Sequence, residues 1–193
     1  DQVKRAEQAL RDESHVLELL NNTGSILAST RDLRSLLRAT TEAALGVSGA
    51  RFGAFIHYGL EGDGTLFSMV TLSGATSSEF QSFGEPRVGT LYPPELRAEG
   101  LVRIDDIAQD PRYAGSAPQF GLPAGHPAVR SYMAVPVAAR SGELLGTMFF
   151  GHPEPGVFTE RSERIVRRIA AQAAVAVDNT RLDEATPRAP GVR

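Results

Sequence analysis

Four histidines are the residues of this sequence best suited to move a proton, hold a metal ion or hydrogen-bond a ligand: His15, His57, His126 and His152. A metal site needs three or four converging ligands. No two of these histidines have the i, i+4 spacing of a helical pair, and there is no HExxH motif, so we expect no metal site. We expect His57, His126 or His152 to contact a bound small molecule, with ordinary strand-end hydrogen bonding as the alternative.

Charged side chains crowd the coil-rich segment of residues 76–130. The group comprises Arg103, Asp105, Asp106, Asp110, Arg112 and Arg130. One interpretation is a polar lid whose arginines orient a ligand with anionic groups, which makes Arg103 and Arg130 ligand-binding residues. The other is a network of ion pairs that holds a long loop in place, because irregular backbone must find partners.

Aromatic and apolar side chains complete the set of candidate ligand-binding residues. Tyr113 and Tyr132 either wall a pocket or belong to the core. In the apolar run 65–72, Phe67 and Met69 share one face of a strand and the intervening residues share the other. Which face meets the helices is open at this stage, so Phe67 and Met69 are predicted as pocket residues by position alone.

No arrangement of residues points to catalysis. The sequence has no cysteine, which excludes disulfides, thiolate metal sites, cysteine nucleophiles and thioether-linked cofactors. Ser131 is not part of a GxSxG elbow, and no GxxxxGK[ST] phosphate loop is present. We therefore expect that this chain has no catalytic activity of its own.

Composition is typical of a globular domain. Of the 193 residues, 41% are hydrophobic and 22% are charged, and the formal net charge is −3. A chain without a positive field is not expected to bind nucleic acid. No apolar run approaches the length of a membrane span, and we expect a cytoplasmic location. The sequence begins at Asp1 without Met or a signal peptide, so we expect it to be a piece of a longer protein.

The elements that must position these residues begin with a helix over residues 3–21. Val3, Ala6, Leu10, Leu17 and Leu20 follow heptad-like steps. Such a helix either lies on its own domain or pairs with a second copy and continues into an upstream module. We take residues 1–27 as a connector helix, residues 28–183 as the domain and residues 184–193 as a disordered tail or linker.

Within the domain the predicted order is helix, hairpin, coil-rich insert with a short strand, hairpin, helix. The helix follows Ser29-Thr30, and the strands are 51–58, 65–72, 101–104, 131–139 and 144–151. A proline at 136 indicates an edge position or a bulge. The last helix starts near Thr159 and has an Ala-rich apolar face. This order predicts an α+β fold, with one antiparallel sheet, the terminal helices on one face and the insert on the other.

The last third of the sequence carries connected motifs. RSYMAVPV at 130–137 is followed by Gly142, then LG at 145–146 and FF at 149–150; FTE at 158–160 leads into IAAQAAVAVDNTRL at 169–182. This pattern resembles the GAF domain family, the sensing and dimerisation modules of sensor histidine kinases, phytochromes and related signalling proteins. Three further motifs look like a GAF subtype that is common in bacterial multi-sensor kinases: VRIDDI at 102–107, DPRY at 110–113 and GLPAGH at 121–126. The resemblance implies a twisted antiparallel sheet with a ligand pocket on the face away from the terminal helices.

The sequence departs from several branches of that family. The methionine sulfoxide reductase branch and covalent bilin binding both need cysteine, which is absent. The Asn-Lys-Phe-Asp-Glu signature of cyclic-nucleotide-binding members is also absent, since the single lysine is Lys4. His152 sits where phytochrome members carry a histidine that meets their chromophore. The cofactor, if there is one, is therefore unknown.

The resulting hypothesis is a sensory module of a bacterial signal-transduction protein, most simply a histidine kinase. It would bind a small ligand or partner, form a parallel homodimer through its N- and C-terminal helices, and pass the signal to neighbouring kinase or PAS-type domains. A second hypothesis is a ligand-free module that only dimerises or spaces its neighbours. A third is an enzyme, either a reductase, which the lack of cysteine argues against, or a hydrolase that would depend on Ser131 or His126.

Overall fold

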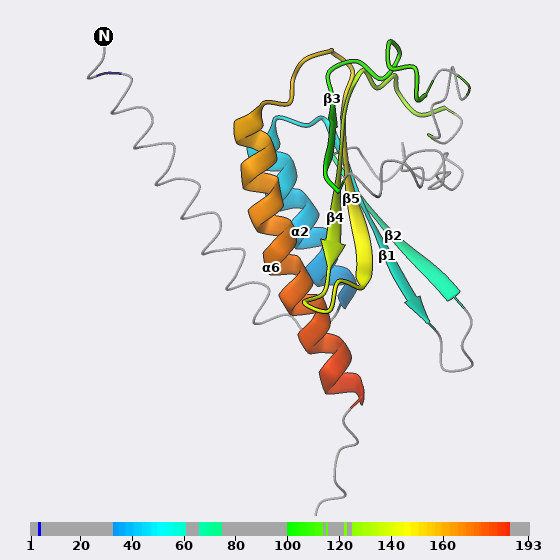
Figure 1. Ribbon diagram of the computed structural model, residues 1–193, viewed down its shortest axis with the longest axis vertical. Helices are drawn as coiled ribbons and strands as arrows, with labels where there is room; N and C mark the ends of the chain where they lie inside the picture. Colours follow the sequence, from blue (N-terminus) through cyan, green and yellow to red (C-terminus); the bar gives the residue numbers. More distant parts are fainter. Residues whose placement is uncertain are drawn as a thin grey trace, which may run out of the picture.

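In the part of the chain that the structure describes, five strands and two helices form an α+β arrangement. The computed structural model describes residues 33–60, 66–74, 100–113 and 125–185, together with Lys4, Gly115 and Leu122. The elements are α2 (Leu33–Ser48), β1 (Phe52–Leu60), β2 (Leu66–Ser73), β3 (Val102–Ile104), β4 (Ser131–Ala138), β5 (Leu144–His152) and α6 (Glu160–Ala185). All neighbouring strands are antiparallel, in the order β2-β1-β5-β4-β3 (Figure 1). The predicted fold class is confirmed.

Helix α2 forms because its apolar residues recur at helical spacing. Leu36, Leu37 and Ala44 are buried on the side that meets the sheet. Thr40, also buried, donates its hydroxyl to the Leu36 carbonyl oxygen at 2.9 Å, so no polar atom of this side chain is left without a partner. The helix ends at Ser48, and Gly49 follows with a φ of 78°, the left-handed conformation that commonly stops a helix.

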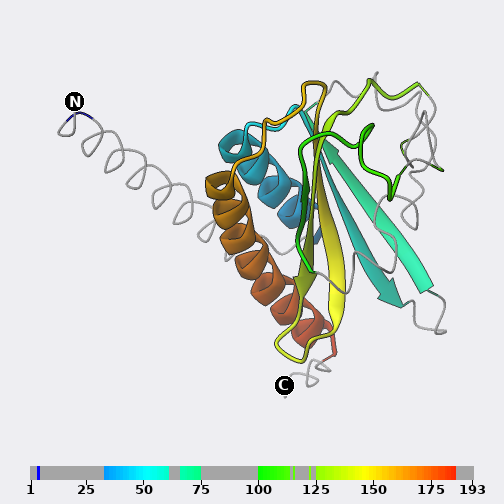
Figure 2. The ribbon, with the colours of Figure 1, turned by 45° about the horizontal axis from the view of Figure 1, so that its top comes forward.

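Helix α6 begins with a reciprocal cap. The backbone N–H of Ser162 donates to Thr159 Oγ1 at 3.2 Å, and the backbone N–H of Thr159 donates to Ser162 Oγ at 2.7 Å. The buried face of α6 carries the short side chains of Ala170, Ala173 and Ala174, which allow α6 to pack closely beside α2. The two helices lie together on one side of the sheet (Figure 2).

Two hairpins build most of the sheet. β1 pairs with β2 through residues 53–60 and 66–73, and β4 pairs with β5 with a register shift between Val137 and Ala138. β3 pairs only with residues 132–134 of β4, so Pro136 lies beyond the end of β3 and next to the irregular step. β4 is an interior strand of the described sheet, so Pro136 is not on an edge strand; it lies where β3 no longer pairs with β4 and one residue before the register shift.

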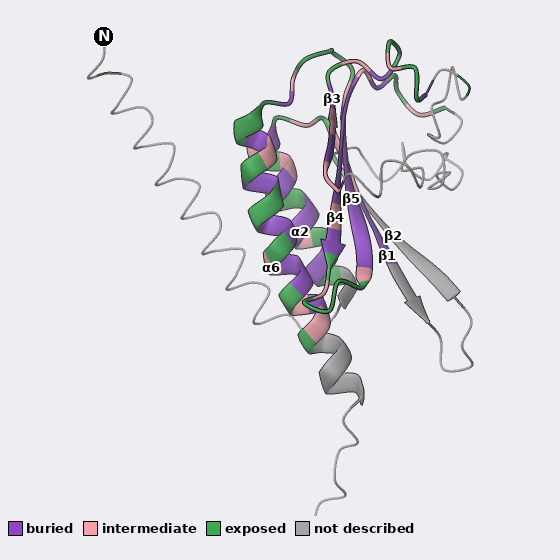
Figure 3. Cartoon of the chain, in the orientation of Figure 1, coloured by how far each residue is buried: buried purple, intermediate pink, exposed green. Residues whose placement is uncertain are grey.

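Strand alternation produces two apolar layers. One face of the sheet, which we call the helix face, places Phe55, Met133, Val135, Met148 and Phe150 against α2 and α6. The opposite face, which we call the insert face, belongs to a second cluster that includes Ile56, Ala134 and Phe149. Buried residues lie on α2 and α6 as well as on the strands that these helices cover (Figure 3).

A close approach fixes one glycine in the centre of the sheet. A Cβ atom added at Gly146 would lie 2.6 Å from the Ile56 carbonyl oxygen and 2.6 Å from Cε1 of Phe55. The Phe55 ring therefore occupies the space that a side chain at position 146 would need. Only glycine fits between β1 and β5 at this point.

Several expectations lie outside the described residues. These are the helix over residues 3–21, of which only Lys4 is described, most of the insert between residues 75 and 99, and the tail from residue 186 onward. α6 extends to Ala185, so Glu184 and Ala185 of the predicted tail are helical. The boundaries at residues 28 and 183 stay predictions. In the part of the chain that is described, no helix is both long and apolar enough to cross a membrane.

Candidate functional site

The insert face is the first part of the candidate site. Its buried cluster draws on four strands and on the end of the insert: Ile56, Val102, Ile104, Ile107, Tyr113, Tyr132, Ala134 and Phe149, with Ala54 and Leu122 partly buried beside them. Three aromatic rings form a continuous row. Tyr113 meets Tyr132 edge to face at a centroid distance of 5.8 Å, and Tyr132 lies 6.4 Å from Phe149. The insert thus covers this face with Ile107 and Tyr113, as the chain order implies.

Thr147 supplies a polar atom in the centre of the insert face. It lies on β5 directly opposite Ile56 of β1 and Pro136 of β4. The side chain is fully buried, and its Oγ1 has no hydrogen-bond partner within the structure as described. Sequence reasoning missed this residue, because a threonine within an apolar strand is ordinary and only its pairing and burial single it out.

The predicted residue His126 lies at the edge of the same face. Its ring meets Phe52 edge to face at 5.0 Å, and Phe52 shares the strand face of Ala54 and Ile56. Nδ1 of His126 lies 2.7 Å from the Pro127 carbonyl oxygen. Of the nine predicted site residues, the structure brings Tyr113, Tyr132 and His126 to the insert face.

His57 and Arg103 lie on the helix face instead. His57 follows Phe55 by two residues on β1 and is buried, and Arg103 pairs with Met133, which belongs to the helix-side core. The register places Met69 opposite His57 and Phe67 opposite Gly59, on the same strand face. The side chains of Phe67 and Met69 are outside the described residues. The two-residue alternation of the strands correctly predicted which residues share a face. It did not predict which face the helices cover.

His152 takes part in a turn. Its Nδ1 accepts a hydrogen bond of 3.0 Å from the backbone N–H of Glu154, just after β5 ends. This is the ordinary strand-end role given as the alternative in the sequence analysis. A ligand-binding role for His152 stays a prediction.

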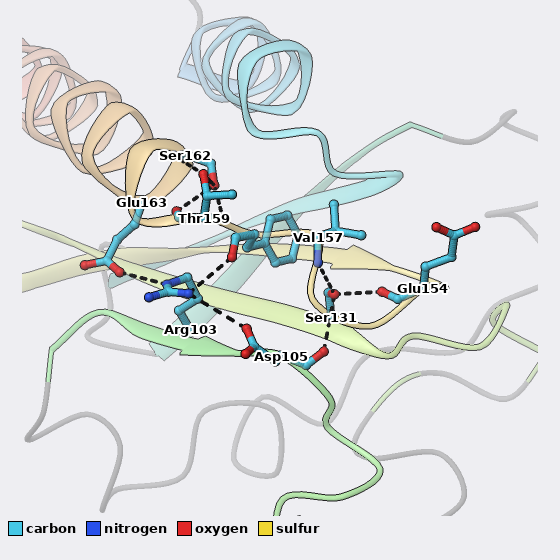
Figure 4. Close-up of polar contacts among 9 residues, drawn as sticks. Arg103, Asp105, Ser131, Glu154, Val157, Thr159, Ser162 and Glu163 are labelled. Atoms are coloured by element: carbon cyan, nitrogen blue, oxygen red, sulfur yellow. Dashed lines mark hydrogen bonds and ion pairs between the residues drawn. The ribbon is translucent and has the colours of Figure 1, made fainter.

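A polar junction on the helix face is the second part of the candidate site. Nε of Arg103 donates to Oε2 of Glu163 at 3.1 Å, and Nη1 donates to the Phe158 carbonyl oxygen at 3.2 Å (Figure 4). Arg103 belongs to the edge strand β3, whereas Glu163 lies in the first turn of α6. Val102 and Ile104, the neighbours of Arg103, are part of the insert-face cluster. The three residues of β3 therefore contact both layers.

Ser131 organises the other end of this junction. Its fully buried hydroxyl donates to the Glu154 carbonyl oxygen at 2.7 Å and accepts from the Val157 N–H at 2.9 Å (Figure 4). The same oxygen lies 3.4 Å from the Asp105 carbonyl oxygen. One hydroxyl thus ties the start of β4 to the turn that leads into α6. The geometry is that of a structural bridge, and among the residues that the structure describes Ser131 has no hydrogen bond to a basic side chain of the kind a nucleophile needs.

The charged residues of the insert form ion pairs with one another. Arg130 makes a two-pronged contact with Asp106, donating from Nε to Oδ1 at 2.7 Å and from Nη2 to Oδ2. Arg112 pairs in the same way with Asp110, at 2.9 Å and 2.6 Å. The hydrogen bonds from these arginines lower the pKa of Asp106 and of Asp110. This arrangement matches the interpretation of the charge cluster as a network that holds the loop in place.

Glu163 is ionised despite partial burial. Removal from water opposes ionisation, but the hydrogen bonds from Arg103 and Arg167 outweigh that effect and lower the pKa of Glu163. The Arg167 contact, at 2.9 Å, is an exposed pair one helical turn along α6. Among the residues that the structure describes, no group of three or more His, Asp or Glu side chains is placed to hold a metal ion.

The fold and the two-layered site define an α+β domain with a covered sheet face. The sequence matches the family model of the GAF domain over residues 30–178, which is more than half of the chain. The chain belongs to the GAF domain family.

Solved structures with the same fold come from proteins of different activities. The GAF domain of an Acinetobacter phosphoenolpyruvate-protein phosphotransferase is 16% identical, with a TM-score of 0.64 over 86% of this chain and 94% of that one. The GAF domain of a putative sensor histidine kinase from Pseudomonas syringae pv. tomato is 14% identical, with a TM-score of 0.62 over 93% and 96%. A free methionine-R-sulfoxide reductase from Neisseria meningitidis, in complex with its substrate, is 15% identical, with a TM-score of 0.63 over 87% and 91%. At these identities the likeness is one of fold.

Proposed function

We propose that this chain is the sensory domain of a cytoplasmic bacterial signal-transduction protein, with a sensor histidine kinase as the leading parent. A small molecule binds on the insert face, and its binding energy shifts the balance between two arrangements of the helix layer. The terminal helices carry that shift to an output domain. Membership of the GAF domain family supports a regulatory role.

The single observation that carries this proposal is the double attachment of β3. Val102 and Ile104 are buried among the insert-face residues, while Arg103 between them holds Glu163 at the start of α6. A ligand that moves β3 must therefore stretch or relieve a contact to α6. Because packed interfaces switch between discrete arrangements, a small shift at this strand is enough to bias the helix.

Ligand binding is tested by thermal unfolding of the purified domain against purines, cyclic nucleotides, haem, bilins and small neutral aromatics. A ligand present at 100 times its Kd raises the free energy of unfolding by about 2.7 kcal/mol, which is a readable shift in Tm. Coupling is tested in the same protein with Arg103→Ala. That variant should still bind the ligand while the ligand-induced change in amide exchange of α6 is lost. Binding without any change in α6 in the unsubstituted domain would contradict the signalling route.

A ligand-free spacer is the second candidate function, and one observation favours it. Ile107, Tyr113 and Tyr132 are almost fully buried, so much of the insert face is filled by the protein's own side chains. In that case the domain would dimerise or space its neighbours without a stimulus. The absence of any Tm shift over the whole panel would favour this function.

We propose that the assembled form is a parallel homodimer with helical contacts. Val175 on α6 is 46% exposed and follows the exposed Ala171 by one helical turn, so two apolar side chains are exposed next to each other on this helix. The heptad-like seam of residues 3–21 would extend that contact. Sedimentation at tens of micromolar should give a dimer that Val175→Glu weakens and Ser141→Glu, on an exposed hairpin, does not. A monomer at this concentration would count against it.

An enzymatic role is not part of the proposal. The reductase relative shares the fold, but this sequence has no cysteine. A hydrolase that used Ser131 would need that hydroxyl free to attack, whereas it bridges Glu154 and Val157. Esterase activity that disappears in Ser131→Ala while the domain stays folded would overturn this view.

A further inference from the structure

We propose that proton uptake by His152 releases the turn between β5 and α6 and loosens the first turn of that helix. The turn comprises residues 153–157, and we call it the β5–α6 turn. The inference goes beyond the proposed function, because it describes a response to pH that needs no ligand. It rests on the hydrogen bonds of this turn, in which one titratable side chain takes part.

Each backbone N–H group of the β5–α6 turn has a hydrogen-bond partner. Glu154 lies between two prolines, which carry no N–H, and its own N–H donates to His152 Nδ1 at 3.0 Å. The N–H groups of Gly156 and Val157 donate, each at 2.9 Å, to a backbone carbonyl oxygen and to a serine hydroxyl. Carbonyl and hydroxyl oxygens keep their acceptor character over the neutral pH range. His152 is therefore the one acceptor of these three that a change in pH removes.

The bond between His152 and Glu154 exists only while the imidazole is neutral. A ring nitrogen that accepts a hydrogen bond carries no proton, so the neutral ring has its proton on Nε2. Both nitrogens of an imidazolium are donors, and a protonated Nδ1 would face the Glu154 N–H as donor against donor. Histidine as a residue type takes up this proton between about pH 8 and pH 5. A modest fall in pH therefore removes the acceptor that holds the first half of the turn.

Glu154 connects this bond to the start of α6. Its carbonyl oxygen accepts from the hydroxyl of Ser131 at 2.7 Å and from the Ser131 backbone N–H at 3.2 Å. The same hydroxyl accepts from the Val157 N–H, two residues before the Thr159 cap of α6 (Figure 4). A rotation of the Glu154 peptide therefore displaces the acceptor of Ser131 and, through Ser131, the residues that lead into the helix.

The charges on the surrounding elements do not offset the lost bond. Six charged residues lie on these elements: Arg51 before β1, Asp105 after β3, Arg130 before β4, Glu154 in the turn, and Glu160 and Glu163 at the start of α6. Arg130 and Glu163 are already paired, with Asp106 and Arg103. In the part of the chain that the structure describes, no ion pair joins an acidic side chain to the His152 imidazole. Protonation there removes a hydrogen bond without adding a described ion pair.

A pH titration of the ¹⁵N-labelled full chain by NMR, from about pH 8 to pH 5, tests the inference. The C–H signals of the His152 ring report its protonation. The amide signals of Glu154 and Val157, and those of Ser162 and Glu163 in the first turn of α6, should shift in step with it. Their protection from exchange, corrected for the pH dependence of the intrinsic rate, should fall by about fivefold, as expected for one lost hydrogen bond.

Two substitutions separate His152 from the other histidines. His152→Asn places an amide oxygen where Nδ1 stands, so it should accept the Glu154 N–H at every pH and abolish the shifts in α6. His126→Asn is the matched control and should leave them in place. The Nδ1 of His126 donates to the Pro127 carbonyl oxygen, a contact that protonation preserves. Shifts in α6 that persist in His152→Asn, or a His152 that titrates while the α6 amides stay unmoved, would overturn the inference.

Stability is an independent readout. The unfolded chain takes up the proton freely, whereas the folded turn needs the neutral ring, so the contribution of His152 is present at high pH and lost in acid. The urea midpoint of His152→Ala should lie below that of the unsubstituted domain at about pH 8, and the difference should shrink toward pH 5. A difference that is constant or grows in acid would refute the inference and leave the sensory function standing. If His152→Ala does not fold, the titrations of the unsubstituted chain and of His152→Asn decide.

Discussion

Arg103 and Glu163 are 60 residues apart in the sequence and joined by a hydrogen bond of 3.1 Å. The pair connects β3, the shortest of the described strands, to the first turn of α6, the longer of the two described helices. Because both side chains are about one quarter exposed, the contact is screened by water and is worth only a modest free energy. Its importance lies in which elements it joins.

Removing this contact should loosen the start of α6 more than it destabilises the domain. Arg103→Ala should lower the free energy of unfolding by about 1 kcal/mol, as expected for a partly exposed charged hydrogen bond. Urea unfolding of Arg103→Ala, Glu163→Gln and the double variant measures the coupling between the two residues. Arg167→Ala is the matched control, since it removes the exposed partner of the same carboxylate. Strictly additive effects of the two substitutions would show that the contact contributes nothing.

Ser131→Ala should be the more damaging change. The substitution leaves the Val157 N–H and the Glu154 carbonyl oxygen without the hydroxyl that joins them. We expect a loss of about 2 kcal/mol in the free energy of unfolding, because the Ser131 side chain is fully buried and its hydroxyl makes two hydrogen bonds to the backbone. Urea unfolding measures it, with Ser141→Ala on the exposed hairpin as the control. An equal, small effect at both positions would contradict the bridging role.

Two glycines should respond in opposite ways to the same substitution. Gly146→Ala forces a methyl group against the Ile56 carbonyl oxygen and the Phe55 ring, and we expect it to cost more than about 2 kcal/mol. Gly46 lies inside α2 with no atom within 4 Å of an added Cβ, so Gly46→Ala should stabilise the domain by about 0.8 kcal/mol. Thermal unfolding of the two variants provides the comparison. A neutral Gly146→Ala would mean that β1 and β5 separate easily.

The ion pair between Asp106 and Arg130 should make stability fall in acid. The hydrogen bond from Arg130 lowers the pKa of Asp106 in the folded protein, below the ordinary value of about 3.9. The stabilisation is therefore present at neutral pH and is lost as the pH falls through the folded-state pKa. The difference in urea midpoint between the unsubstituted domain and Asp106→Asn should be constant from pH 7 to about pH 5 and shrink below about pH 4. A difference that grows in acid would reverse the sign and refute the assignment.

Sequence pattern was sufficient for the order and type of the elements. The turn-rich segments between apolar runs predicted both hairpins, and the Ala-rich stripe after Thr159 predicted α6. These signals are local, because they depend on residues two to four positions apart. The match to the GAF domain family confirms the resemblance carried by residues 130–182.

The assignment of faces was beyond the sequence. Alternation groups Phe55 with His57 and Val102 with Ile104, but it does not say which group meets the helices. The position of His57 on the helix face is fixed by tertiary packing of β1 against α2, which the alternation within the strand does not encode. Thr147 and the Arg103–Glu163 contact were missed for the same reason, since neither leaves a local signal.

The short pairing of β3 has a consequence for behaviour in concentrated solution. In the described structure, β3 pairs with β4 only as far as Ala134. Past this residue the side of β4 that faces away from β5 has no neighbouring strand, and Pro136 lies in that unpaired stretch. A proline lacks the amide hydrogen that a foreign strand would need, and the adjacent irregular step bends the backbone away from a flat template. This stretch of β4 is thereby shielded from pairing with a strand of a neighbouring molecule, so self-association through it is disfavoured.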